Sequence, residues 1–111
     1  MSQRLELTDK VQRIESIEQK FGISIQSIYA LWTLDEYRQQ LMVNFDVLSG
    51  GAGLPDSISL VASVYNGKNQ LIQTSQEFLD DETFVGFQSV SIIMFDVMEA
   101  PALIRVTPQA I

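Results

Sequence analysis

The 111-residue sequence contains neither cysteine nor histidine. Without cysteine there can be no disulfide, no thiol nucleophile and no zinc or iron–sulfur site held by thiolates. Without histidine the chain lacks the usual general base at neutral pH and the commonest transition-metal ligand. These two absences exclude most hydrolase mechanisms and leave carboxylate chemistry with magnesium or calcium. We therefore predict a protein that is not an enzyme and needs no cofactor.

Basic residues are also scarce, with 7 lysines and arginines against 14 acidic residues and a net charge of −7. Residues 1–22 are balanced in charge, so the whole acidic excess belongs to the remainder. An acidic surface is a poor ligand for phosphate groups, so we expect no nucleic-acid partner and no anionic membrane.

No apolar run reaches the length of about 20 residues that a membrane-spanning helix needs. The first six residues, Met1 to Glu6, include an acidic residue and no continuous apolar stretch, which does not fit a secretory signal. We expect a cytoplasmic protein. The hydrophobic content of 46% and the length of 111 residues predict a single folded domain over residues 1–111.

The segment 8–22 has the spacing of an amphipathic helix. Thr8 can cap its start, and Gly22 can end it. Four apolar side chains recur at helical intervals and would form one stripe: Val11, Ile14, Ile17 and Phe21. We predict an N-terminal helix over residues 8–22, followed by a β-sandwich over residues 23–108.

From Ile23 onward the apolar period changes to two, which is typical of strands. Alternation is clearest in 37–48, where the residues predicted to face inward are Leu41, Val43, Phe45 and Val47. In the preceding strand the apolar phase shifts between Ile25 and Ile28, which predicts a bulge or burial on both faces. Trp32 in that strand is expected to be the core tryptophan.

Further strands are expected over 57–64, 70–78, 84–97 and 102–107. Asn66-Gly67 predicts a tight hairpin, and the polar strand after it is expected at a sheet edge. Phe84 and Phe87 flank Gly86, and their rings belong either to the core or to an exposed aromatic patch. Regular strands without helical crossovers favour a mainly antiparallel sandwich or barrel.

Part of this pattern resembles a known family. Val43-Asn44-Phe45-Asp46-Val47, then Val61-Ala62-Ser63-Val64-Tyr65-Asn66-Gly67 and Leu71-Ile72, are similar to the FxLYD-type domains of bacterial proteins. The resemblance covers about half the chain, and the sequence departs from it at Asn66, where Asp is usual. It implies an immunoglobulin-like fold and supplies no catalytic residues. We therefore predict a mainly β protein: an immunoglobulin-like antiparallel β-sandwich of six to eight strands, preceded by one N-terminal amphipathic helix.

Three consecutive acidic residues, Asp80, Asp81 and Glu82, form the densest acidic run. Some β-sandwich domains hold calcium between loop carboxylates, because this hard cation takes six to eight oxygen ligands from flexible segments. With the loop carboxylates at Asp35, Glu36 and Asp56, this run makes a calcium-binding sandwich one alternative function. The other reading of the run is a solvated turn.

The leading hypothesis is a non-enzymatic interaction or structural module with a protein partner or as a homo-oligomer. Its docking surface would be a sheet edge or the helical stripe Val11, Ile14, Ile17 and Phe21, which must pack on its own sandwich or on another chain. A second alternative is a small carboxylate-only enzyme. Its only candidates would be Asp46 and Asp96, which lie within β runs and would have to share a pocket.

Overall fold

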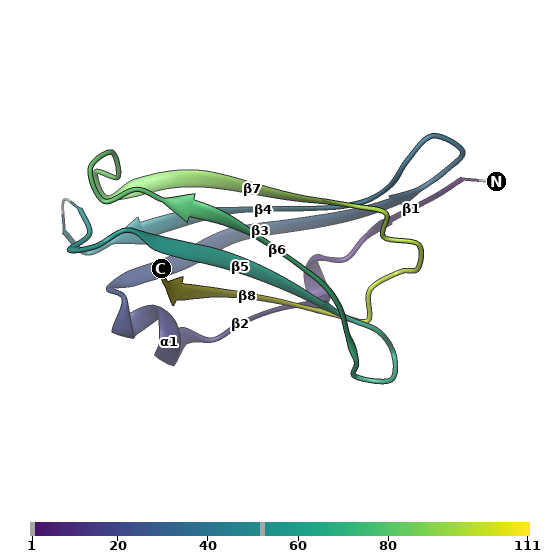
Figure 1. Ribbon diagram of the computed structural model, residues 1–111, viewed down its shortest axis with the longest axis horizontal. Helices are drawn as coiled ribbons and strands as arrows, with labels where there is room; N and C mark the ends of the chain where they lie inside the picture. Colours follow the sequence, from purple (N-terminus) through teal and green to yellow (C-terminus); the bar gives the residue numbers. More distant parts are fainter. Residues whose placement is uncertain (1, 52) are drawn as a thin grey trace.

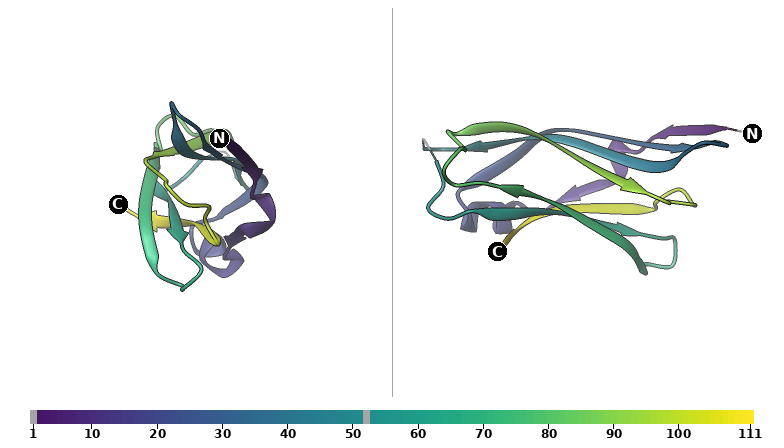
Figure 2. Two further views of the ribbon diagram at one scale, coloured as in Figure 1. Left: turned by 90° about the vertical axis from the view of Figure 1, so that its right-hand side faces the viewer. Right: turned by 45° about the horizontal axis from the view of Figure 1, so that its top comes forward.

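The computed structural model describes residues 2–51 and 53–111, and its strands form two four-stranded sheets packed face to face (Figure 1). One sheet has the order β1-β3-β4-β7 and the other the order β2-β8-β5-β6. The strands are β1 (Gln3–Glu6), β2 (Val11–Arg13), β3 (Ile23–Leu34), β4 (Gln39–Ser49), β5 (Ile58–Tyr65), β6 (Leu71–Leu79), β7 (Phe87–Phe95) and β8 (Leu103–Ala110). The molecule is elongated, at 47 × 26 × 22 Å. The view along its long axis shows the two sheets on either side of the interior (Figure 2, left).

The core lies between the sheets and is built from every second residue of the central strands, as the pleat requires. In β4 the inward set is fully buried, which confirms the prediction for Leu41, Val43, Phe45 and Val47. From the opposite sheet, Leu60, Ala62 and Val64 of β5 meet them. A one-residue slip in either strand would turn these side chains toward solvent, so burial fixes the register.

Trp32 of β3 is buried, as predicted, and its indole nitrogen donates a hydrogen bond to the carbonyl of Val97 at 2.9 Å. The predicted irregularity in this strand is also present. The β3–β4 register shifts between Gln26 and Tyr29, where Ser27 adopts a φ of 56°. The bulge lets the apolar residues before and after it point into the same core.

The predicted Asn-Gly hairpin joins β5 to β6. Its turn is closed by the backbone of Asn66 and Gln70, and Asn69 takes a left-handed φ of 64°. Strand β6 lies at the edge of its sheet, as its polar sequence predicted.

The β4–β5 and β6–β7 loops lie against each other at one end of the sandwich. Gly86, with a φ of 109°, makes this contact, because a Cβ at this position would lie 2.9 Å from the carbonyl oxygen of Gly51. Any side chain here would strain the backbone and push the two loops apart.

The predicted helix over residues 8–22 is wrong. The segment forms a 3₁₀ turn, η1 (Thr8–Lys10), then β2, then a single short helix, α1 (Glu15–Lys20). β2 pairs in parallel with β8, matching Val11 to Ile104 and Arg13 to Val106. The backbone groups of β2 thus pair with β8, a strand more than ninety residues later in the chain, instead of with each other in a helix. This long-range pairing overrides the helical spacing of the apolar residues.

The coarse prediction of a mainly β chain in two sheets is confirmed. The immunoglobulin-like class is not confirmed by these pairings alone. No helix in the described part of the chain is long and apolar enough to cross a membrane.

Candidate functional site

The predicted metal-binding residues lie in the β6–β7 loop, where their polar atoms stabilise the turn. Asp80 accepts a hydrogen bond from the backbone nitrogen of Glu82 at 2.8 Å. Asp81 accepts one from the hydroxyl of Ser57 at 2.7 Å, and its own backbone nitrogen donates to the same hydroxyl oxygen at 2.9 Å. These bonds join the β6–β7 loop to the segment that precedes β5.

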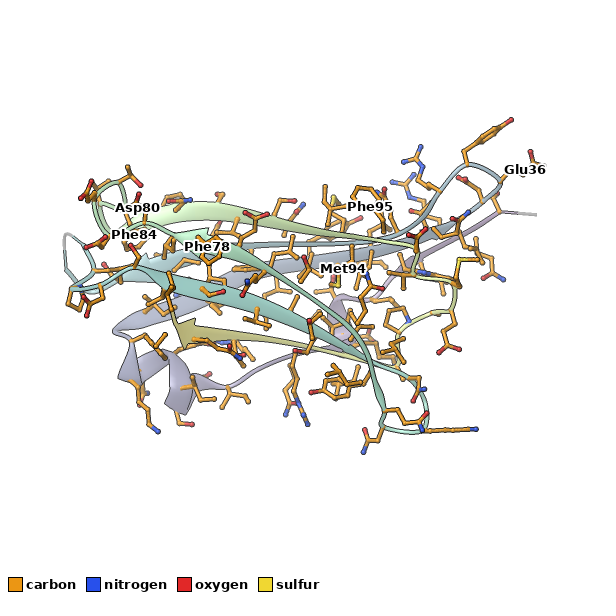
Figure 3. All side chains as sticks on the ribbon, viewed as in Figure 1. Glu36, Phe78, Asp80, Phe84, Met94 and Phe95 are labelled. Carbon is orange, nitrogen blue, oxygen red and sulfur yellow. The ribbon has the colours of Figure 1, made fainter. Side chains whose placement is uncertain are left out.

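The other acidic loop, containing Asp35 and Glu36, lies at the opposite end of the long axis (Figure 3). It therefore cannot share an ion with Asp80. Within residues 2–51 and 53–111, no group of three or more acidic side chains is close enough to hold a metal ion. The acidic run has the geometry of a hydrogen-bonded turn.

The four residues predicted to form a docking stripe are separated by the correction of the helix. Val11 is in β2, Ile14 precedes α1, Ile17 is within it and Phe21 follows it. All four are half-buried, and Val11 and Phe21 pack against the core of their own chain. They therefore do not form the continuous helical stripe that their spacing predicted.

The polar centre of this region is Glu18, whose side chain is only 1% exposed. Its carboxylate accepts hydrogen bonds from the Nε of Arg13 at 3.0 Å and from the backbone nitrogen of Ile25 at 3.1 Å. The bond to Glu18 raises the pKa of Arg13 above its ordinary value. This ion pair joins β2, α1 and β3, and sequence periodicity gave no sign of it.

The candidates for a carboxylate enzyme, Asp46 and Asp96, do not meet. Asp46 lies opposite Ser89 in the β4–β7 pair, whereas Asp96 follows the other end of β7. The distance along the strand is about 20 Å at the usual rise of a strand, far more than paired catalytic carboxyls allow. Asp46 instead accepts a hydrogen bond from the hydroxyl of Ser89 at 2.7 Å.

The four edge strands that the structure describes differ in how they are protected against pairing with another chain. Charges, short length, bulges and inward-pointing charged side chains all discourage such pairing. β1 has four residues, among them Arg4 and Glu6, and β2 has three, among them Arg13. β6 carries a register shift, and its Glu77 lies opposite the buried Leu60, on the inner face.

β7 has none of these protections. It is nine residues long, contains no charged residue and no proline, and pairs with β4 without a register shift. Its inner apolar side chains are buried, whereas three large apolar side chains point outward: Phe87, Ile93 and Phe95, which are 55%, 43% and 64% exposed. Phe78 of the neighbouring edge strand β6 is exposed as well. Figures 1 and 3 look onto the edges of the two sheets that end in β6 and β7, with these two strands in front of the inner strands.

The backbone of β7 is also available. Ser49 donates from its nitrogen to the carbonyl of Gly86, and backbone groups in an antiparallel ladder alternate between the two sides of a strand. The groups of Val90 and Ile92 therefore face β4, and those of Ser89, Ser91 and Ile93 face the open edge. At the end of the strand the carbonyl of Phe95 accepts a bond from the side chain of Gln73 at 3.0 Å.

The hollows of the described surface are open rather than enclosed. One of them, of about 810 Å³, lies between the end of α1 and the segment before β5, and it is lined in part by Phe21, Leu54, Pro55 and Ile58. No charged group is buried in its wall, and it adjoins none of the features of β7.

No protein-family model, curated protein or solved structure matches this chain in comparisons with known proteins. The resemblance to FxLYD-type domains therefore stays a prediction.

Proposed function

We propose that this chain is a non-enzymatic interaction module that binds an extended strand of a protein partner along the open edge of β7. The observation that carries this proposal is the contrast among the edges. Of the four described, β7 alone combines length, regular pairing, absence of charge and exposed aromatic side chains.

Strand addition divides its work between backbone and side chains. Hydrogen bonds from the edge give affinity, and pockets for alternate side chains give specificity. In β7 the residues whose backbone faces the edge include Ser89, Ser91 and Ile93. The same alternation places Phe87, Ile93 and Phe95 on the outer face, where they would contact side chains of the added strand. Of the two docking surfaces considered from the sequence, a sheet edge or a helical stripe, the proposal uses the sheet edge.

The strand order supports an immunoglobulin-like relationship as part of this proposal. If β3 to β8 are taken as the first six strands, the orders β3-β4-β7 and β8-β5-β6 correspond to A-B-E and F-C-C′ of that fold. The position beside β8, where a last strand would lie, is occupied by β2 in the parallel direction. On this view the first residues of the chain complete the second sheet.

The test uses variants that block the edge without disturbing the β4–β7 ladder. Ser91→Pro removes a nitrogen that faces the open edge, and edge strands tolerate proline at such positions. Ile93→Lys adds a charge of the kind that protects natural edges. Thr74→Lys, on the exposed face of β6, is the matched control for added charge.

Each variant serves as bait in an extract of the cells that naturally produce the protein, with cross-linking to locate the contacts. We expect partners cross-linked beside β7 to be captured by the wild type and by Thr74→Lys, and to be lost with Ser91→Pro and Ile93→Lys. Capture of the same partners by all four proteins would refute the proposal, provided that the variants keep the wild-type melting temperature.

A further inference from the structure

We infer that the strand added to β7 is the β7 strand of a second copy, running antiparallel, with Ser91 on the two-fold axis. This inference rests on the proposed function and names its partner. The two four-stranded sheets that contain β7 would then join into one continuous sheet across the dimer.

The register follows from the strand itself. Ser91 is the middle residue of Phe87–Phe95, so antiparallel pairing about it leaves no overhang at either end. Ser91 then lies opposite its own copy, Ser89 opposite the partner copy's residue 93, and Phe87 opposite the partner copy's residue 95. Each aromatic ring meets an aromatic ring, a favoured cross-strand pair.

The backbone agrees with this register. In an antiparallel pair, opposed residues either exchange both hydrogen bonds or exchange none. The central residues Ser89, Ser91 and Ile93 all turn their nitrogen and carbonyl groups to the open edge. Pairing about Ser91 sets these residues opposite one another, so each would exchange both bonds. Pairing shifted by one residue would set edge-facing groups against groups already bonded to β4.

Charge also favours β7 over the other edges as a self-pairing surface. Each copy carries a net charge of −7, so two copies repel each other at long range. β7 contains no charged residue, so no like charges would meet within the contact. Salt screens the long-range repulsion and leaves an uncharged contact intact. The dimer is therefore expected to strengthen as the salt concentration rises.

The contact is small. One pair of nine-residue strands belongs at the low end of interface sizes, below about 1,200 Å² in total. The carbonyl of Phe95, already bonded to Gln73, adds nothing unless that bond opens. We expect a reversible dimer whose population rises with protein concentration.

Cysteine trapping tests the register, because the chain has no cysteine of its own. Ser91→Cys places two thiols directly opposite, with Cα atoms about 5.5 Å apart, within the range that a disulfide spans. Ser89→Cys is the matched control. Ser89 points outward on the same strand, as Ser91 does. Its replacement also removes one hydroxyl hydrogen bond, to Asp46, just as replacing Ser91 removes the bond to Asn44. Its two copies would be about 13 Å apart, because four residues of strand separate them.

Under mild oxidation of the full chain we expect Ser91→Cys to form a disulfide-linked dimer rapidly and Ser89→Cys to remain monomeric. Sedimentation of the wild type should show a dimer that increases with protein and salt concentration. Equal linking of both variants, or linking of neither, would overturn the inference. If neither cysteine variant links while Ser91→Pro still abolishes partner capture, the second copy is rejected as the partner and the strand-addition function stands. If partner capture also survives Ser91→Pro, the dimer and the strand-addition function are both rejected.

Discussion

Arg13 and Glu18 form an ion pair in which the arginine Nε lies 3.0 Å from a carboxylate oxygen of a side chain that is 1% exposed. The same carboxylate accepts the backbone nitrogen of Ile25. Only the carboxylate is buried, since the Arg13 side chain is 31% exposed. Removing Glu18 therefore leaves the arginine in contact with solvent but leaves the buried backbone nitrogen of Ile25 without its acceptor.

Glu18→Ala is therefore expected to lower the free energy of unfolding by about 1–3 kcal/mol, the usual cost of a buried donor left without an acceptor. Glu15→Ala is the control, since Glu15 is exposed and lies 4.0 Å from the same arginine, and its loss should cost less than about 1 kcal/mol. Urea unfolding of both variants measures the difference. Equal, small effects would show that the buried carboxylate does not hold β2, α1 and β3 together.

Two phenylalanines test the placement of the core. Phe45 is buried between the sheets, and Phe45→Ala should cost about 3–5 kcal/mol through lost burial and a cavity. Phe95 is 64% exposed, and Phe95→Ala should change the free energy of unfolding of the monomer by about 0.5 kcal/mol or less. Denaturant unfolding in dilute solution compares them. A larger loss for Phe95 would mean that the phase of β7 relative to the core is inverted.

Calcium at millimolar concentration is expected to leave the melting temperature unchanged. Asp80 and Asp81 are bonded within their own turn and to Ser57, and the described residues provide no third acidic side chain close enough to complete a site. A tight site would raise stability by mass action. A rise of several degrees that Asp80→Asn with Asp81→Asn abolishes would favour the calcium alternative.

Asp35 should make a small pH-dependent contribution to stability. The backbone nitrogen of Tyr37, and that of Arg38, donate to its carboxylate and lower its pKa below the ordinary 3.8. A lowered pKa in the folded state gives stability that is present above the unfolded pKa and lost as the pH falls through the folded one. NMR titration should place the carboxyl midpoint below 3.8, and Asp35→Asn should abolish this part of the acid dependence. A midpoint at or above 3.8 would contradict it.

The sequence predicted those elements whose local residue pattern reflects their burial or turn geometry. Alternation in β4 revealed its buried face, the phase shift in β3 revealed its bulge, and Asn66-Gly67 revealed a hairpin. The prediction for segment 8–22 failed because its structure depends on pairing with β8 and on the Arg13–Glu18 ion pair. Neither contact produces a periodic pattern in the local sequence.

The candidate site was predicted only as an unspecified sheet edge, because strand order is a property of the topology. The sequence did hold one signal: residues 87–95 contain large apolar residues on both faces and no charged residue. That pattern suits an interior strand equally well. Phe84 and Phe87 show the same ambiguity, since the first is buried and the second exposed.

Residue-resolved hydrogen exchange along β7 distinguishes an open edge from a covered one, because edge-facing amides of β7 in the isolated chain have no partner and β4-facing amides do. In dilute protein we predict slow exchange at Val90, Ile92 and Met94 and fast exchange at Ser89, Ser91 and Ile93. At protein concentrations that favour association, the second set should become protected while the first set is unchanged. Uniformly slow exchange along β7 in dilute protein would show that its edge is already covered within the chain and is not free to pair with another strand.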